Sequence, residues 1–188
     1  MALSKIQTGL LADGSVDTTQ LAGSAVTDAK LASTLDISGK TVTYGLTDAD
    51  LPAGSVLQVV QATTISLASA SNTTFVSTNL SATITPSSTS SKILIIGQHG
   101  SARINGSSNG IKLRLMRGGT FLLHPVYEFL YSTVGIDGAI PFHYLDSPST
   151  TSATTYLTEF ALLTGASSTG QINPNSVPAV IILMEISA

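Results

Sequence analysis

The hydrophobic positions in the first third of the chain recur every ten residues. A β-branched residue is followed five positions later by leucine and alanine, and glycine or other small residues separate the copies. The large apolar positions of the repeat are Ile6, Leu11, Val16, Leu21, Val26 and Leu31. One such unit buries too little apolar surface to offset the entropy of ordering its own backbone. We therefore expect these six side chains to pack against other copies of the same chain.

The ten-residue period differs from that of the common elongated folds. A coiled coil needs a seven-residue repeat, and an amphipathic helix needs apolar residues three and four positions apart. In a strand, Val16 and Leu21 would point to opposite faces because their spacing is odd. The repeat therefore predicts a short extended piece followed by about one helical turn, beginning near Thr18 or near Thr27 and Asp28. The alternative is a flexible, low-complexity leader whose repeat is accidental.

From residue 55 the pattern changes to short β-branched or alternating segments, separated by glycine, proline, serine and asparagine. This pattern is typical of strands joined by turns. The predicted strands are 56–60, 63–67, 73–76, 80–84, 93–96, 111–116, 121–123, 139–145, 154–163 and 179–186. The continuous apolar run from Ile93 to Ile96 predicts a fully buried strand, and residues 117–120 predict a hairpin turn. Residues 127–131 fit either a helical turn or the end of a strand.

No segment has the periodicity of a long helix, so the chain is predicted to be all-β. Short strands with regular turn signals indicate an antiparallel β-sandwich or a jelly-roll-like head. We expect three regions: a repeat stalk over residues 1–36, a short strand (40–44) with a linker over residues 37–54, and the head over residues 55–188.

The composition narrows the range of partners. Only 10% of the residues are charged and the net charge is −3, whereas about 25% is usual for soluble domains. A weakly charged surface suits a packed assembly and does not favour nucleic acid as a partner. No apolar run approaches the roughly 18 residues of a membrane span, so no membrane insertion is expected. Lys112 and Arg114 alternate with apolar residues and are predicted to lie on the solvated face of one strand.

Candidate catalytic chemistry is sparse. The absence of cysteine excludes thiol catalysis and cysteine-bound zinc. His99, His124 and His143 do not have the spacing of a metal site, and His124 is expected to be a strand-end residue with a satisfied hydrogen bond. The carboxylates that could pair as in a glycosidase are Glu128, Asp137, Asp146 and Glu159. Their spacing specifies no pair, so we predict neither an enzyme nor a cofactor or metal.

Half of the ten aromatic residues lie between positions 127 and 144. Aromatic side chains usually fill a core or a subunit interface, but exposed tyrosines could also stack on sugar rings. The polar loops 105–110 and 147–152 are further candidates for a contact surface. The candidate receptor-binding residues are Asn105, Ser107, Asn109, Tyr127, Tyr131 and Tyr144.

Several segments resemble phage fibre proteins, especially those of cyanophages. The repeat, with its Asp-Gly-Ser-Val and Leu-Ala words, is similar to the N-terminal stalks of these fibres. Segments 54–60, 80–94, 113–118, 144–148 and 183–186 resemble their C-terminal modules. The resemblance covers nearly the whole chain. It implies a homotrimeric structural protein of the virion with a β-rich head, attached to another virion protein through its N-terminal segment.

The resemblance leaves the place on the particle open. A tail fibre would bind a receptor on the host surface, with a glycan as a candidate partner. A capsid head fibre or decoration protein would need no receptor. A monomeric carbohydrate-binding module with a disordered leader is a third alternative. Residues 1–36 can span no more than ~120 Å, so the stalk is expected to be a compact stem, which favours the decoration alternative more than the resemblance alone does.

Overall fold

The computed structural model describes residues 50–106, 109–132, 136–165 and 168–188. The chain divides into two units, Met1–Gly45 and Leu46–Ala188, and all described residues belong to the second. The ten-residue repeat and the strand predicted at 40–44 lie outside the described residues. The six repeat positions therefore keep the status of sequence predictions.

The described residues form ten strands and one short 3-10 helix. The elements are β1 (Val56–Thr64), β2 (Ala68–Ala70), β3 (Val76–Ile84), β4 (Lys92–Asn105), β5 (Asn109–Arg117), β6 (Thr120–Ser132), β7 (Ile136–Asp146), β8 (Thr154–Leu162), β9 (Thr169–Ile172), η3 (Pro174–Ser176) and β10 (Ala179–Ile186). Every described strand pair is antiparallel. The predicted all-β class is confirmed.

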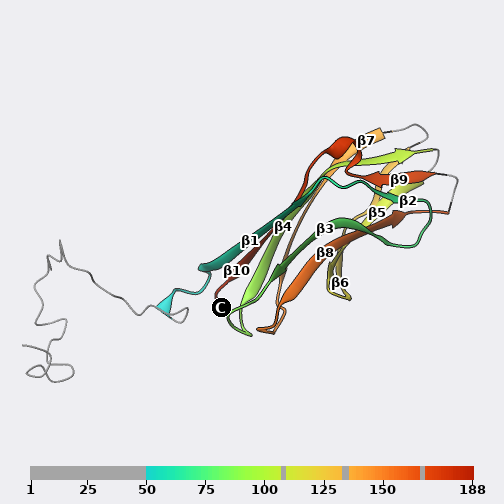
Figure 1. Cartoon of the computed structure of the whole chain (residues 1–188). Coiled ribbons are helices and arrows are strands. Elements are labelled where there is room, and N and C mark those ends of the chain that lie inside the picture. Colours follow the sequence, from blue (N-terminus) through green and yellow to red (C-terminus); the bar gives the residue numbers. More distant parts are fainter. Residues whose placement is uncertain (1–49, 107–108, 133–135, 166–167) are drawn as a thin grey trace, which may run out of the picture. The chain divides into compact units, whose positions relative to one another are not determined.

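Two sheets pack face to face (Figure 1). The six-stranded sheet has the order β1-β10-β4-β9-β2, and β7 pairs with the other edge of β4. The four-stranded sheet has the order β3-β8-β5-β6. Strands from distant parts of the sequence are neighbours, because β1 pairs with β10 along its full length. This arrangement confirms the antiparallel sandwich predicted from the strand pattern.

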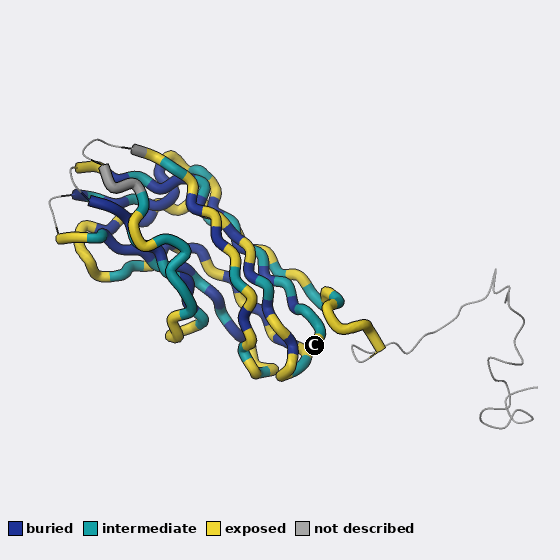
Figure 2. The backbone as a smooth tube through the Cα atoms, turned by 180° about the vertical axis from the view of Figure 1, so that it is seen from behind, coloured by how far each residue is buried: buried dark blue, intermediate teal, exposed yellow. Residues whose placement is uncertain are grey.

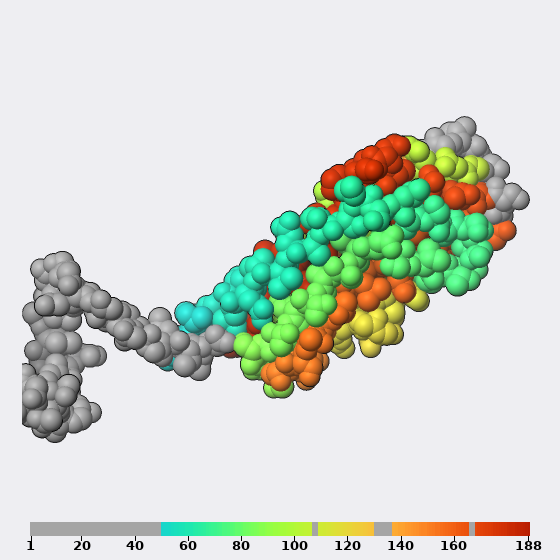
Figure 3. Space-filling view, in the orientation of Figure 1, coloured from blue at the N-terminus to red at the C-terminus, as the bar shows by residue number. Residues whose placement is uncertain are grey.

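Alternating side chains form the core between the sheets. In Figure 2 buried and exposed positions follow one another along the strands. In β10, Ala179, Ile181 and Leu183 are fully buried, whereas the residues between them are half-buried. The largest buried side chains of the other sheet are Tyr156 and Phe160 of β8. Contacts between β1 and β3, which run side by side in Figure 3, close one edge of the sandwich, and contacts between β6 and β7 close the other.

The prediction of a fully buried strand at residues 93–96 is wrong. Ile93 and Ile95 are completely buried, but Leu94 is half-buried and Ile96 is 41% exposed. The run belongs to β4, which lies between β10 and β7 with only one face on the core. An apolar run therefore occurs here because the outer face of this sheet is also apolar.

Several strand boundaries also differ from the predictions. Residues 65–67 and 73–75 are not in strands, and the sequence pattern did not predict β9. The undecided segment 127–131 continues β6, so the strand alternative is correct. β2 and β9 are only three and four residues long; β2 pairs with β9, and β9 pairs with the far end of β4. Such short strands depend on pairing with distant segments, which local patterning does not reveal.

A buried polar network joins the two sheets. The His99 ring of β4 is fully buried, and its Nε2 lies 2.9 Å from the Thr158 hydroxyl of β8. Thr158 also lies 2.6 Å from the hydroxyl of Thr78 in β3, which donates to the Thr158 carbonyl at 3.0 Å. Burial lowers the pKa of His99 to about 4, although the neighbouring Asn173 side chain opposes part of that shift. The ring is therefore neutral at pH 7.

Candidate functional site

The β5–β6 hairpin forms one edge of the four-stranded sheet. Arg117 pairs with Thr120, and Gly118 and Gly119 make the turn between them. Gly118 has φ +52°, a left-handed conformation that glycine adopts without strain. The hairpin predicted at residues 117–120 is confirmed.

The edge strand β6 contains repeated β-bulges. Ile111, Leu113 and Leu115 of β5 pair with Phe129, Val126 and Leu123, so three residues of β6 pass for every two of β5. Each bulge resets the alternation of side chains along β6. Leu123, Val126 and Phe129 therefore all pack against the core although their spacing is odd.

The same bulges place a second set of side chains together on the outer face. The ring centroids of Phe121 and His124 are 4.9 Å apart, and those of His124 and Tyr127 are 5.3 Å apart in an edge-on arrangement. Phe121 is 49% exposed and Tyr127 is 62% exposed. The His124 Nδ1 lies 2.9 Å from the Leu113 carbonyl oxygen, which holds the ring in place. The expected hydrogen bond of His124 is therefore present, although the residue lies within a strand and not at its end.

Charged groups adjoin these rings. Phe75, just before β3, lies 5.9 Å from the His124 ring and beneath the Arg114 guanidinium, which is 4.0 Å from the Phe75 centroid. The Lys112 Nζ lies 5.3 Å from the same centroid. Arg114 Nε donates to Glu159 at 2.7 Å, which fixes the guanidinium over the ring. We call Phe75, Phe121, His124 and Tyr127, together with Lys112 and Arg114, the aromatic surface.

The aromatic surface has the chemistry of a binding surface. Exposed rings bury apolar area and stack on flat apolar faces at a low entropic cost. The Tyr127 hydroxyl and the two cationic side chains can form hydrogen bonds with hydroxyl or carboxylate groups. Such a combination fits the face and edge of a sugar ring, which presents C–H groups on one side and hydroxyls around its rim.

The residues predicted to form a contact loop at 105–110 differ in their exposure. Asn105 is exposed and donates to Gln171 at 3.3 Å. Asn109 is fully buried, donates to the Thr164 carbonyl oxygen and accepts hydrogen bonds from the backbone of Gly110 and Thr164. The expectation that Asn109 contacts a receptor is therefore wrong, because its polar atoms hold the β5 and β8 ends together. Ser107 lies outside the described residues.

The predicted tyrosines are not grouped together. Tyr127 belongs to the aromatic surface, whereas Tyr144 of β7 is half-buried and packs against the core. The side chain of Tyr131 lies outside the described part of the chain. Phe129 and Phe142 also contribute to the core. The expectation that aromatic side chains fill a core therefore applies to part of the group between positions 127 and 144.

Phe75, Phe121 and His124 were not predicted as site residues. Phe121, His124 and Tyr127 are spaced by three, which in a regular strand would put neighbours on opposite faces. A second set, Leu123, Val126 and Phe129, has the same three-residue spacing. Two such sets side by side in the sequence are the signal that could have predicted a bulged strand with these rings on one face. Phe75 has no local signal, because its place depends on the pairing of β3 with β8.

Arginines bind three of the four carboxylates considered for a glycosidase pair. Asp137 pairs with Arg103 at 2.6 Å, Asp146 with Arg117 at 2.7 Å, and Glu159 with Arg114. Asp146 also accepts a hydrogen bond from the Tyr156 hydroxyl at 2.7 Å; burial and this bond raise the pKa of Tyr156. Within the described ranges no three histidine or acidic residues are grouped closely enough to hold a metal ion.

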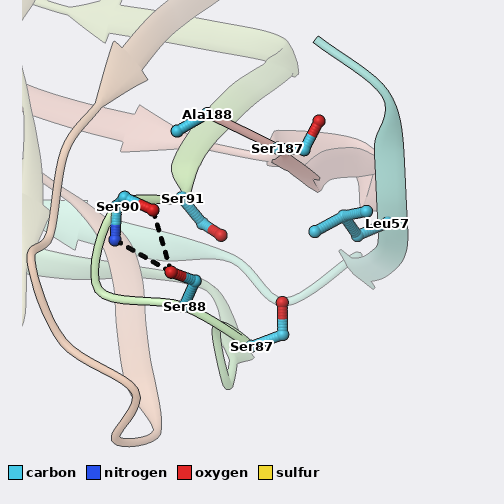
Figure 4. A pocket seen from close by; sticks show the side chains of 7 residues that line it. All are labelled: Leu57, Ser87, Ser88, Ser90, Ser91, Ser187 and Ala188. Carbon is cyan, nitrogen blue, oxygen red and sulfur yellow. Dashed lines mark hydrogen bonds between the residues drawn. The ribbon is translucent and has the colours of Figure 1, made fainter. Parts of the chain in front are cut away.

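A second candidate site is a pocket lined by serine side chains near the ends of the strands (Figure 4). This pocket of about 320 Å³ is formed by Leu57, Ser87, Ser88, Ser90, Ser91, Ser187 and Ala188. The Ser88 and Ser90 hydroxyls lie 2.9 Å apart. Close by, the buried Glu185 accepts hydrogen bonds at 2.7 Å from both the backbone nitrogen and the hydroxyl of Ser87. Burial opposes the charge of Glu185, but hydrogen bonds from Gln58 and Ser87 outweigh it and lower its pKa. Glu185 therefore anchors the loop that forms this pocket.

No protein-family model matches the sequence, and a comparison with curated proteins finds no match. The fold is similar to that of a chain in the structure of infectious bursal disease virus Gt strain, with a TM-score of 0.41, 14% identity and coverage of 80% of this chain. It is also similar to a chain in the crystal structure of the infectious bursal disease virus VP2 subviral particle, with a TM-score of 0.40, 16% identity and coverage of 71% of this chain. The chain spans 43% and 39% of the length of these two viral chains.

The described residues include no helix with the length and hydropathy needed to cross a membrane.

Proposed function

We propose that this chain is a structural fibre protein of a phage virion, with a homotrimeric stem and a β-sandwich head that contacts the host surface. Residues 1–36 would form the stem with two further copies and attach to another virion protein. Residues 55–188 would form the head, and residues 37–54 would connect the two. The aromatic surface would bind a host-surface glycan.

The observation that carries this proposal is the exposed ladder of rings on β6. Two large aromatic side chains are about half exposed or more on a bulged edge strand, next to a cation fixed over a third ring. Bulges at sheet edges often re-aim side chains beside a binding site. The weakly charged composition and the resemblance of the repeat and the head segments to phage fibres support the virion role.

Removing the two exposed rings should abolish most of the receptor binding and leave the fold intact. With Phe121→Ala and Tyr127→Ala together, we expect the purified protein to compete about thirtyfold less well with phage adsorption to host cells, because each ring contributes about 1 kcal/mol. Adsorption is measured by counting unadsorbed phage. Circular dichroism of the variant should match that of the wild type, because both side chains face solvent.

The matched variant is Asn105→Ala at the exposed end of β4, next to the predicted contact loop, which should compete like the wild type. A loss of competition with Asn105→Ala but not with the double variant would contradict a role for the aromatic surface and assign binding to the loop. Periodate oxidation of the host cells tests the glycan itself. If oxidised cells still bind the protein fully, the receptor is not a glycan.

The stem should need the apolar positions of the repeat. The full chain should have a native mass three times the 19.3 kDa of one chain. Leu21→Asp with Leu31→Asp should lower this mass or its stability to dilution, because charges would replace side chains expected to be buried between copies. Native mass spectrometry measures both effects, and Gln20→Asp is the matched control at a polar repeat position. A wild-type chain that is monomeric at micromolar concentration would contradict the fibre proposal.

Because the repeat is short, a capsid head fibre or decoration protein is the alternative to a tail fibre. Antibodies against the head should label the tail of the phage particles in electron micrographs if the protein is a receptor-binding tail fibre. Labelling distributed over the capsid would favour a head fibre or decoration protein, and the adsorption experiment would then show no effect of the ring substitutions.

A further inference from the structure

The outer face of the six-stranded sheet is apolar. Over β1, β10 and the adjoining parts of β4 and β7, cross-strand rows bring outward-facing residues together, such as Val59, Met184, Leu94 and Leu145. Val59, Ile96 and Leu145 are 57%, 41% and 50% exposed. We call the following residues the apolar face: Val59, Leu94, Ile96, Pro141, Leu145, Val180, Ile182 and Met184.

The apolar face has the size of an interface. Four strands spaced ~4.8 Å apart and about eight residues long at ~3.4 Å per residue present a flat area of ~500 Å². Monomeric proteins rarely expose apolar patches larger than a few hundred Å². This ~500 Å², which includes the polar positions of these rows, is more than half of the ~800 Å² that one partner contributes to a specific interface.

The chemistry of the apolar face excludes a charged partner. Its polar neighbours in the same rows are Gln61, Thr63, Gln98 and His143, and the described charged residue on this outer side is Lys92, which pairs with Ile186 at the end of the rows, whereas Asp146 and Glu185 are buried on the other side of the sheet. Arg114 and Glu159, by contrast, lie on the outer face of the other sheet. Branched aliphatic side chains without charges are typical of permanent interfaces, which resemble a core cut in half. When two copies of this face pack together, no charged side chain is buried without a partner.

A hollow at the centre of the face can receive a side chain. A cavity of about 290 Å³ lies between β4, β7 and β10 and is lined by Ile96, Gln98, Pro141, Val180 and Ile182, among others. Apolar pockets of this kind, at the centre of an interface, bind protruding side chains of the partner and carry much of the binding energy.

We infer that the apolar face of each head packs against the heads of the other copies, facing the axis of the assembly. This inference rests on the proposed homotrimer. β1 is the edge strand of the face, and it is the first strand after residues 37–54, which connect it to the repeat. If the repeat segments of three chains form one stem, they would bring the three β1 strands, and hence the three apolar faces, near one another. The rings of the aromatic surface, on the other sheet, would remain free for the host.

Cysteine labelling of the full chain tests this inference. The chain has no cysteine, so a single introduced thiol reports only on its own position. Ile96→Cys places a thiol at the centre of the apolar face, and Ser81→Cys places the matched control on the exposed outer side of β3. Both changes are small and should leave the fold intact. We expect a maleimide reagent to label Ile96→Cys at least tenfold more slowly than Ser81→Cys in the native assembly, with equal rates after unfolding in urea.

The native mass of the same samples separates the possible outcomes. Slow labelling of Ile96→Cys in a trimer supports the inference. Equal labelling rates in a trimer would overturn it while the proposed homotrimer stood, because the stem alone would then hold the copies together. Slow labelling in a monomer would overturn both, and would show that another segment of the same chain covers the face. Equal rates in a monomer would also overturn both.

Discussion

Replacing Gly97 with alanine should destabilise the head by about 3 kcal/mol. A Cβ at this position of β4 would overlap the Phe142 ring and lie 2.6 Å from the backbone oxygen of Val180. The Phe142 ring is itself buried, and the Val180 oxygen belongs to the ladder between β10 and β4. The overlap can therefore be relieved only by separating two central strands. Urea unfolding followed by circular dichroism measures the loss.

Gly119→Ala is the matched control for this prediction. Gly119 lies in the β5–β6 turn, and an added Cβ there would meet nothing within 4 Å. We expect the unfolding free energy of this variant to stay within about 0.5 kcal/mol of the wild type. Equal effects of the two substitutions would show that backbone freedom, and not the packing of Phe142 over Gly97, determines the cost.

The head should lose about 3 kcal/mol of stability as the pH falls from 6.5 to 4 because of His99. The pKa of His99 is about 4 in the folded protein, and its ordinary value is 6.5. Above pH 6.5 the ring is neutral in both the folded and the unfolded states, so it contributes no pH dependence. Between these values the unfolded chain takes up a proton that the folded chain does not, and unfolding becomes more favourable. Below pH 4 both states are protonated and the effect of His99 levels off.

Glu185 adds a separate acid effect at lower pH. Its hydrogen bonds hold the folded-state pKa below the ordinary value of 4.5. Its stabilising contribution is therefore present above the unfolded value and is lost as the pH falls through the folded value. The two groups act in adjoining pH ranges, so a titration of stability can distinguish them.

Unfolding in urea at several pH values measures the His99 effect. His99→Gln keeps a polar group beside Thr158 but cannot titrate, so its stability should change little between pH 6.5 and 4.5. If His99→Gln loses as much stability as the wild type over this range, carboxylates and not His99 are responsible.

Local patterning predicted most of the strands for a clear physical reason. Residues such as those of β5 and β10 alternate between core and surface, and this two-residue period is present in the sequence itself. The β5–β6 turn was also predictable, since two glycines follow an alternating segment. β2 and β9 were not, because three- and four-residue strands form only by pairing with distant partners.

The candidate site was less predictable than the fold. Tyr127 was named from the sequence and belongs to the aromatic surface. Phe121 and His124 were not named, because their three-residue spacing brings them together only on a strand with repeated bulges. Asn109 appeared to be a polar loop residue, yet its amide holds the backbone of Thr164 and Gly110, which lie beside it only in the folded sheet.

The sequence by itself determined the all-β class and the hairpin turn, whereas the packing of the repeat against other copies of the chain stays a prediction. Period and composition are local properties, and they suffice for these conclusions. The tertiary structure alone decided which rings share a surface, which polar groups are buried, and that the run at residues 93–96 has one face outside the core. The reason is that these properties depend on the register between strands far apart in the chain, and the register is set when the two sheets close over a common core.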